Sequence, residues 1–270
     1  MEHIDRIALI AGNGKFPIFL ATAAKLNGVN VIAIAINSES DKEIEKVADK
    51  VYWINLGELK KLVDLLKKEQ IRYAVMAGKI TKTTIFKESI RLDEEAKRLF
   101  GRVMDKKDDT LLSAVASRLK ELGIELLDST TFVKGMMPSK GVLTKRKPDR
   151  QESEDIEFGY RIAKEIGSLD IGQAVAVKQK ALIAVEAIEG TDEMIKRAGR
   201  LVGPKTVIVK VSKPSQDMRF DVPVVGLRTI ESLKEAASSA LAVEAEKVLI
   251  LEKEEVVKEA DRCGIAIVAV

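Results

Sequence analysis

Short apolar runs, two of them ending in glycine, alternate with helical patterns through the first half of the chain. The runs RIALIAG (6–12), VNVIAIAI (29–36) and RYAVMAG (72–78) have the length and the continuous apolar character of buried strands. The segment LKKLVDLLKKE (59–69) between two of them has the periodicity of an amphipathic helix. Strands that alternate with helices indicate a parallel sheet with helices on both faces. We therefore predict a Rossmann-like α/β domain over residues 1–133.

The second half of the chain predicts a different α/β arrangement. Residues 134–151 are rich in Pro, Gly, Met and basic side chains, and we interpret them as an interdomain linker. The segment GQAVAVKQKALIAVEAIEG (172–190) is typical of a β-hairpin, and KTVIVKVSK (205–213) indicates a further strand. We predict a smaller C-terminal domain with a mixed sheet over residues 152–270, so that the fold class is α/β in both domains.

The composition limits the chemistry that the chain can perform. It has 270 residues with one cysteine, Cys263, and one histidine, His3. A histidine-based triad, a Cys–His pair and a zinc site of His and Cys ligands are therefore not expected. The net charge of +3 is too small to indicate a nucleic-acid partner. Catalysis should instead use carboxylates, lysine, backbone amides or an oxygen-bound metal such as Mg²⁺.

The sequence also bears on the cellular compartment. No apolar run approaches the roughly 20 residues that a transmembrane helix needs, and the N-terminus lacks the pattern of a secretory signal. A single cysteine excludes an intramolecular disulfide. We therefore expect a cytoplasmic protein.

The segment AGNGKFP (11–17) lies where the first strand passes into the first helix, which is where α/β sheets bind ligands. The dinucleotide fingerprint is broken, because Pro17 stands in the place of its third glycine. A phosphate, sugar or base site and a simple tight turn are the two interpretations. A second strand end, MAGKI (76–80), adds a glycine and a lysine. These segments supply the first candidate substrate-binding residues: Gly12, Asn13, Gly14, Gly78 and Lys79.

Three carboxylates surround a predicted helix start in VEAIEGTDEM (185–194), where Thr191 is the expected N-cap. Phosphate alone would be repelled there, whereas phosphate bridged by Mg²⁺ would not. The alternative is that the third acid complements the helix dipole while the other two are solvated. The three candidate metal ligands are Glu186, Glu189 and Asp192.

Polar and apolar side chains alternate in KPSQDMRFDVP (213–223). In an extended chain, Asp217, Arg219 and Asp221 would share one face. A solvated edge strand is one interpretation, because Pro214 and Pro223 both discourage a central strand. The other interpretation is a catalytic edge, on which the aspartates bind metal and orient water.

Seven segments together resemble one known family in order and spacing: AGNGKFP, AGKI, DDTLL, PSKGVLTKRKP, DIGQAVAVK, EAIEGTD and KPSQDMRFDVPVVG. The chain is similar over nearly its whole length to the I-type UDP-2,3-diacylglucosamine pyrophosphatases of the lipid A pathway, the LpxI family. It departs from the family pattern at Asp149, where a threonine is sometimes expected, and at Lys15 in the first loop.

This resemblance implies hydrolysis of UDP-2,3-diacylglucosamine to UMP and 2,3-diacylglucosamine 1-phosphate (lipid X), with water attacking the sugar-side phosphorus. It also implies Mg²⁺ (or Mn²⁺) dependence, a homodimer, transient contact with the membrane surface, and a substrate cleft between two α/β domains. A non-catalytic sugar-nucleotide binding protein is the alternative, and a nucleotide-sugar transferase or oxidoreductase is disfavoured by the broken fingerprint.

The resemblance also implies residue roles. It assigns catalysis to Asp217, Asp221, Lys213, Gln216 and Arg219, with Lys213 and Arg219 neutralising phosphate oxygens. It adds Asp217 to the metal ligands. It extends the substrate-binding set to Thr144, Arg146, Gln173, Gly190 and Thr191.

Overall fold

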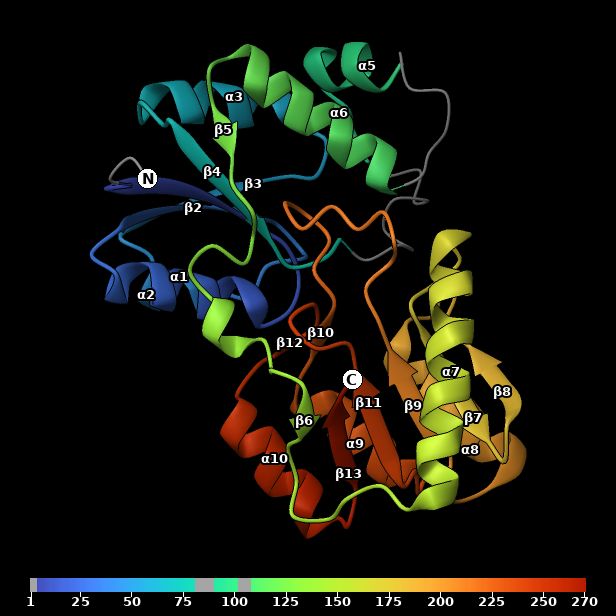
Figure 1. The fold of residues 1–270 in the computed structure, drawn as a ribbon. Helices are drawn as coiled ribbons and strands as arrows, with labels where there is room; N and C mark the ends of the chain where they lie inside the picture. Colours follow the sequence, from blue (N-terminus) through green and yellow to red (C-terminus); the bar gives the residue numbers. More distant parts are fainter. Residues whose placement is uncertain (1–3, 81–89, 102–107) are drawn as a thin grey trace. The chain divides into compact units, whose positions relative to one another are not determined.

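The protein, seen in a computed structural model that describes residues 4–80, 90–101 and 108–270, divides into two compact units (Figure 1). The first unit comprises Met1–Val133 and Asp217–Asp221, and the second comprises Lys134–Gln216 and Val222–Val270. The chain therefore passes between the units at three places, because a short segment of the second half belongs to the first unit.

The first unit contains a parallel sheet with the strand order β3-β2-β1-β4-β5. Its strands are β1 (Arg6–Ala11), β2 (Asn30–Ile36), β3 (Lys50–Ile54), β4 (Tyr73–Ala77) and β5 (Glu125–Leu126). Apart from its first residue, β2 is buried throughout, which explains its continuous apolar sequence. The strand order reverses between β1 and β4, so the carboxyl ends of these two strands flank the position where open α/β sheets bind ligands.

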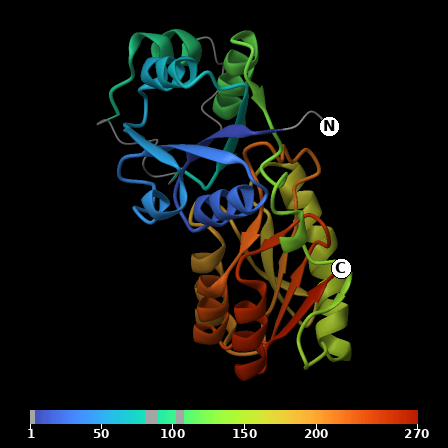
Figure 2. The same ribbon diagram turned by 90° about the vertical axis from the view of Figure 1, so that its left-hand side faces the viewer.

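Helices cover both faces of this sheet (Figures 1 and 2). On one face lie α1 (Phe16–Leu26) and α2 (Ile44–Val47). On the other lie α3 (Leu59–Lys68), α5 (Glu94–Phe100) and α6 (Asp108–Glu121), packed on an apolar core from β1 to β5.

The second unit contains a mixed sheet with the order β6-β13-β11-β9-β7-β8. Its strands are β6 (Gly141–Val142), β7 (Ala174–Lys178), β8 (Ala181–Val185), β9 (Val207–Lys210), β11 (Ala240–Val243) and β13 (Ala266–Ala269). The three central strands β9, β11 and β13 are parallel, while β7 and β8 form the predicted antiparallel hairpin. A small separate sheet pairs β10 (Val224–Val225) with β12 (Leu249–Ile250).

Two apolar layers hold helices against the second sheet. One face packs on α7 (Arg150–Ser168), which begins with a capping box formed by Asp149 and Glu152. The other face packs on α8 (Thr191–Val202), α9 (Leu227–Glu235) and α10 (Lys253–Arg262). No helix in the described ranges is long and apolar enough to cross a membrane.

The α/β fold class with a parallel and a mixed sheet is confirmed, but the linker interpretation of residues 134–151 is corrected. These residues belong to the second unit, which they enter through a short 3₁₀ helix, η1 (Lys134–Met136). Strand β6 then pairs with β13, and the guanidinium of Arg146 bonds to Glu152 in α7. Backbone pairing and a partly buried ion pair thus bind this segment to the second unit.

The extended conformation expected for residues 213–223 is wrong. The chain forms turns there, because the backbone N–H groups of Phe220 and Asp221 both donate to the carbonyl oxygen of Asp217. Phe220 is 8% exposed and packs in the core of the first unit. Burial of this aromatic ring and local turn bonding therefore outweigh the alternating pattern.

Candidate functional site

The loops that follow β1 and β4 meet at the carboxyl edge of the first sheet. The backbone of Asn13 exchanges two hydrogen bonds with that of Lys79, at 2.7 and 3.2 Å. Gly78 has a φ of +84°, and a Cβ atom there would lie 2.7 Å from the carbonyl oxygen of Asn13. A Cβ atom on Gly12 would lie 2.8 Å from the carbonyl oxygen of Lys79. The predicted substrate loops are thus brought together, and two of their glycines are required by this close approach.

The segment Asp217–Asp221 also belongs to the first unit. Arg219 donates from Nη2 to Asp217 Oδ2 at 2.6 Å and from Nε to Oδ1 at 2.9 Å, and its backbone N–H donates to the same carboxylate. The bond from Arg219 holds the pKa of the Asp217 carboxyl below its usual value. This pair combines a carboxylate that remains ionised with a cation suited to phosphate oxygens.

A buried polar chain joins Lys210, Thr191 and Glu186 at the carboxyl edge of the second sheet. Lys210, at the end of β9, is 7% exposed, and its Nζ donates to Thr191 Oγ1 at 2.9 Å and to the carbonyl of Val224 at 3.0 Å. Thr191 donates to Glu186 Oε1 at 2.7 Å, and the backbone N–H of Gln173 donates to Oε2. The Oε1 atom of Gln173 is buried and has no hydrogen-bond partner in the described part of the chain. The structure therefore gathers three predicted residues around a lysine.

The other two predicted acids of this edge have partners of their own. Arg197 donates to Glu189 at 2.7 Å. Burial of Glu189 works to raise its pKa, but the bond from Arg197 and backbone bonds outweigh it, so that the pKa lies below its usual value. Asp192 accepts a long bond from Thr229, and Gly190, with a φ of +84°, directly precedes α8.

These carboxylates do not form a metal cage by themselves. Within the described residues, no group of three or more His, Cys, Asp or Glu side chains could hold a metal ion. Of the predicted ligands, Asp217 belongs to the first unit, whereas Glu186, Glu189 and Asp192 belong to the second. Single carboxylates fit only the mode in which Mg²⁺ is held by one or two of them together with substrate phosphates and water.

The loop before the 217–221 segment is held to the second unit by Glu244. The Glu244 carboxylate accepts hydrogen bonds from the backbone N–H of Ser212 at 2.8 Å, from Lys164 Nζ and from the Tyr160 hydroxyl. Burial, and then the neighbouring carboxylate, raise the pKa of the Tyr160 hydroxyl. Lys164 also donates to the carbonyl of Ser212.

The two predicted catalytic residues of this loop are tied to each other. The backbone N–H of Lys213 donates to Gln216 Oε1 at 2.9 Å. The ammonium of Lys213 pairs with Asp170 at 2.8 Å, and the Lys213 side chain is 13% exposed. Both residues thus lie at the carboxyl edge of the second sheet, where β9 ends.

Thr144 and Arg146 lie at the opposite, amino edge of the parallel strands of the second sheet. Thr144 Oγ1 accepts from the backbone N–H of Ile267, near the start of β13. The Arg146 guanidinium donates to the carbonyl oxygens of Gly264 and Ser239, which precede β13 and β11. The structure thus does not bring these two residues together with the polar chain of Lys210, and their substrate-binding role stays a prediction.

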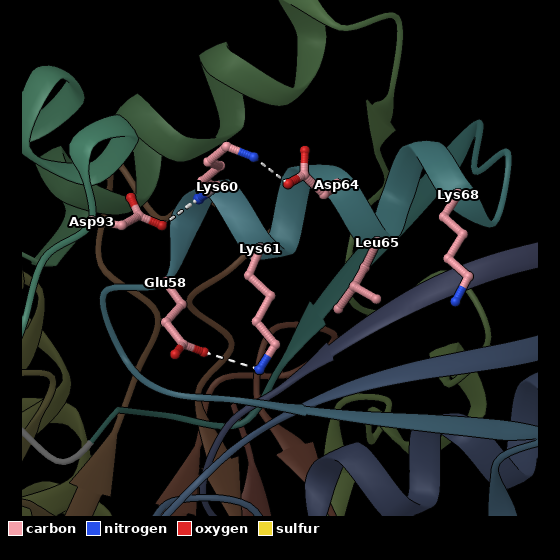
Figure 3. A pocket seen from close by; sticks show the side chains of 7 residues that line it. All are labelled: Glu58, Lys60, Lys61, Asp64, Leu65, Lys68 and Asp93. Atoms are coloured by element: carbon pink, nitrogen blue, oxygen red, sulfur yellow. Dashed lines mark hydrogen bonds and ion pairs between the residues drawn. The ribbon is translucent and has the colours of Figure 1, made fainter.

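The hollow drawn in Figure 3 contains none of the predicted site residues. It measures about 390 Å³ along α3, and apart from Leu65 its lining is charged. Four of these six charged side chains pair with each other, Lys60 with Asp64 and Lys61 with Glu58 (Figure 3). A second hollow, of about 440 Å³, lies at the amino edge of the second sheet. The candidate site is therefore carried by the carboxyl ends of the strands rather than by these hollows.

Sequence reasoning missed three residues that hold the candidate site together. Lys210 and Glu244 are charged residues at or just after the end of an apolar strand, and this position is the signal that indicates a buried, functional charge. Ser129 carries no comparable signal, because its contacts with residues 218 and 219 are formed only in the tertiary structure.

The strand reversal in the first sheet and the mixed second sheet with buried charges at its edge define the class as a two-domain α/β protein. Family models narrow the class. The LpxI N-terminal domain matches residues 6–136 and the LpxI C-terminal domain matches residues 139–268. The chain belongs to the LpxI family.

A curated relative agrees with these models. The UDP-2,3-diacylglucosamine pyrophosphatase LpxI of Caulobacter vibrioides is 28% identical over 278 aligned positions, which cover 98% of this chain and 97% of the relative.

Similarity to solved structures is weak. The biotin carboxylase domain of the Hydrogenobacter thermophilus 2-oxoglutarate carboxylase is 16% identical with a TM-score of 0.30, over 74% of this chain and 41% of that chain. The glycinamide-RNase-transformylase T of Mycobacterium tuberculosis is 14% identical with a TM-score of 0.26, over 51% and 37% of the two chains. Scores this low carry no functional information.

Proposed function

We propose that this protein hydrolyses the pyrophosphate of UDP-2,3-diacylglucosamine to UMP and 2,3-diacylglucosamine 1-phosphate. The observation that carries the proposal is the match of both LpxI domain models along nearly the whole chain, together with the name of the Caulobacter relative. The absence of His–Cys chemistry from the sequence and the clustering of carboxylates and cations at the strand ends agree with phosphoric anhydride hydrolysis.

In this reaction the oxygen of water forms a bond to the sugar-side phosphorus, and the bond from that phosphorus to the bridging oxygen breaks. UMP leaves with the bridging oxygen. The protein must therefore orient a water molecule and stabilise negative charge on the phosphate oxygens.

The Asp217–Arg219 pair supplies both groups in one turn. The Asp217 carboxylate is held ionised by Arg219, so it can accept a hydrogen bond from water at neutral pH. Arg219 and Lys213 are the cations that we assign to phosphate oxygens, and Asp221 is the second acid of the turn.

A divalent cation, Mg²⁺ or Mn²⁺, belongs to the proposal. When bound, it would neutralise the pyrophosphate and lower the pKa of water. Asp217 and the acids Glu186, Glu189 and Asp192 are the candidate ligands. Within the described residues no three of these acids form a group that could hold a metal ion, which favours a site completed by substrate phosphates.

Two partner assignments also remain proposals. The diacyl substrate places the enzyme at a membrane surface, and exposed large apolar side chains such as Leu169 and Ile188 are compatible with transient contact there. The homodimer rests on the family resemblance alone.

The test is release of UMP from labelled UDP-2,3-diacylglucosamine, followed with and without EDTA. We expect stoichiometric UMP and lipid X in the presence of Mg²⁺. Saturable binding of the substrate without any UMP release would instead identify a sugar-nucleotide binding protein.

A further inference from the structure

The segment Asp217–Asp221 is a short excursion of the chain. Residues on both sides of it, up to Gln216 and from Val222 onward, belong to the second unit, whereas the segment belongs to the first. Five residues cannot form a core of their own, so their conformation depends on what the first unit provides. Two groups anchor the segment to the first unit. The first is the ring of Phe220, which is buried with the core residues of the first sheet.

The second anchor is Ser129, which follows β5 and is 1% exposed. Its backbone N–H donates to the carbonyl oxygen of Met218 at 2.9 Å. Its hydroxyl lies 2.8 Å from the carbonyl oxygen of Arg219 and 2.5 Å from that of Met76 in β4. A hydroxyl has one proton, so these two carbonyls share it. Ser129 thus joins two consecutive peptide groups of the excursion to a central strand.

The turn that carries Ser129 is itself fixed. The Asp128 carboxylate accepts hydrogen bonds from the backbone N–H and the hydroxyl of Thr130. The Asp128 carbonyl oxygen accepts a hydrogen bond from the hydroxyl of Thr131. The backbone N–H of Leu127 donates to the carbonyl oxygen of Ala74 in β4. The turn that carries Ser129 is thus bonded both internally and to β4.

We propose that Ser129 is a positioning residue for the pyrophosphatase reaction, and this inference rests on the proposed function. It holds the carbonyls of Met218 and Arg219, so it fixes the backbone from which the side chains of Asp217 and Arg219 project. Loss of the hydroxyl leaves the Arg219 carbonyl without its donor and lets the ion pair shift relative to the sheet. Ser129 acts through these residues and has no part in bond making.

The experiment compares Ser129→Ala with Thr131→Ala, which removes a hydroxyl from the same turn without touching the excursion. For Ser129→Ala we expect kcat to fall roughly 3- to 10-fold with KM changed less than about twofold, the scale of one neutral hydrogen bond. Amide hydrogen exchange at residues 218–221 should become faster. Thr131→Ala should leave both measurements at wild-type values.

Two additional variants separate positioning from stability. Ser129→Cys keeps a weak donor, so its kcat should lie between the wild type and the alanine variant. In the Asp217→Ala background, Ser129→Ala should lower kcat further by less than about twofold, because both changes affect one unit.

Unchanged exchange at residues 218–221 and unchanged kcat in Ser129→Ala would overturn the proposal. The proposal would also be overturned if Ser129→Ala had a lower melting temperature but kept the wild-type kcat and the wild-type exchange rates at residues 218–221, both measured below that temperature. Ser129 would then contribute to stability alone. If the wild-type enzyme releases no UMP, the proposed function fails. In that case exchange at residues 218–221 still tests the serine: faster exchange in Ser129→Ala shows that Ser129 holds the excursion, and unchanged or slower exchange shows that it does not.

Discussion

The ammonium of Lys210 donates to the hydroxyl of Thr191 across 2.9 Å, and through this hydroxyl it is linked to the buried carboxylate of Glu186. Neither charged group is more than 8% exposed. A buried cation and a buried anion are thus connected by a single neutral side chain at the start of α8. Such a network is stabilising only while every member keeps its partner.

Replacing Lys210 by Met should therefore destabilise the second unit. The change leaves Thr191 Oγ1 and the Val224 carbonyl without their donor, and we expect the free energy of unfolding to fall by about 1–3 kcal/mol. Urea unfolding at neutral pH is the measurement. Lys247→Met, at an exposed position, is the matched control and should stay within about 0.5 kcal/mol of the wild type. Equal stability of the two variants would contradict a structural role for the Lys210 bonds.

Asp217 and Asp221 should be needed for the reaction rather than for the fold. Alanine at either position removes a charge and little volume, so we expect at least one variant to lose kcat by roughly 10²-fold or more. Substrate affinity should stay constant or increase, because a carboxylate that faces the pyrophosphate repels it in the ground state. Single-turnover hydrolysis and substrate binding of both variants and of the double variant test this. If all three variants hydrolyse the substrate at near-wild-type rates, the catalytic carboxylates must instead be among Glu186, Glu189 and Asp192.

The Asp217–Arg219 pair makes a specific prediction for acid stability. The usual carboxyl pKa is 3.8, and in the folded protein it is lowered by Arg219, so the stabilising contribution is complete above 3.8. It should be lost as the pH falls from 3.8 through the lower folded pKa. The difference in unfolding free energy between wild type and Asp217→Asn should thus be constant near neutral pH and shrink in acid. A difference that does not change down to pH 2 would show that the pair contributes nothing.

Activity should depend on a divalent cation. Removal of metal with EDTA should abolish UMP release, and Mg²⁺ or Mn²⁺ should restore it, because the candidate ligands are oxygen atoms. Calorimetric titration with Mg²⁺ in the presence and absence of UMP distinguishes a site completed by phosphate from one made by protein alone. Full turnover in excess EDTA would remove the metal role assigned to the four acids.

Gly78 should tolerate alanine much less well than Gly28. Both have a positive φ, of +84° and +77°, so each substitution costs about 1–2 kcal/mol in backbone strain. Only at Gly78 would the new Cβ meet a backbone atom, the Asn13 carbonyl oxygen at 2.7 Å. We therefore expect Gly78→Ala to unfold at a clearly lower urea concentration than Gly28→Ala. A similar urea midpoint for the two variants would mean that the loops after β1 and β4 can move apart without loss of stability.

The α/β class, the parallel sheet of the first half and the hairpin at β7 and β8 could all be predicted from the sequence. These features depend on local periodicity, since a continuous apolar run followed by an amphipathic segment has few other ways to bury its surface. With one histidine and one cysteine, the chain leaves carboxylates and lysines as its candidate reactive groups, and the order of its short motifs carries the family resemblance.

The place of residues 217–221 in the first unit, and the bonds that hold them there, could not be predicted from the sequence. Their alternating pattern predicted a strand, but the buried ring of Phe220 and the bonds from Ser129 place them in the first unit as turns. The hydroxyl of Ser129 and the carbonyl of Arg219 are 90 residues apart in the chain. Such a hydrogen bond forms only when elements that are distant in the sequence pack together. No local sequence pattern encodes it, because its contribution to stability depends on the burial of both donor and acceptor.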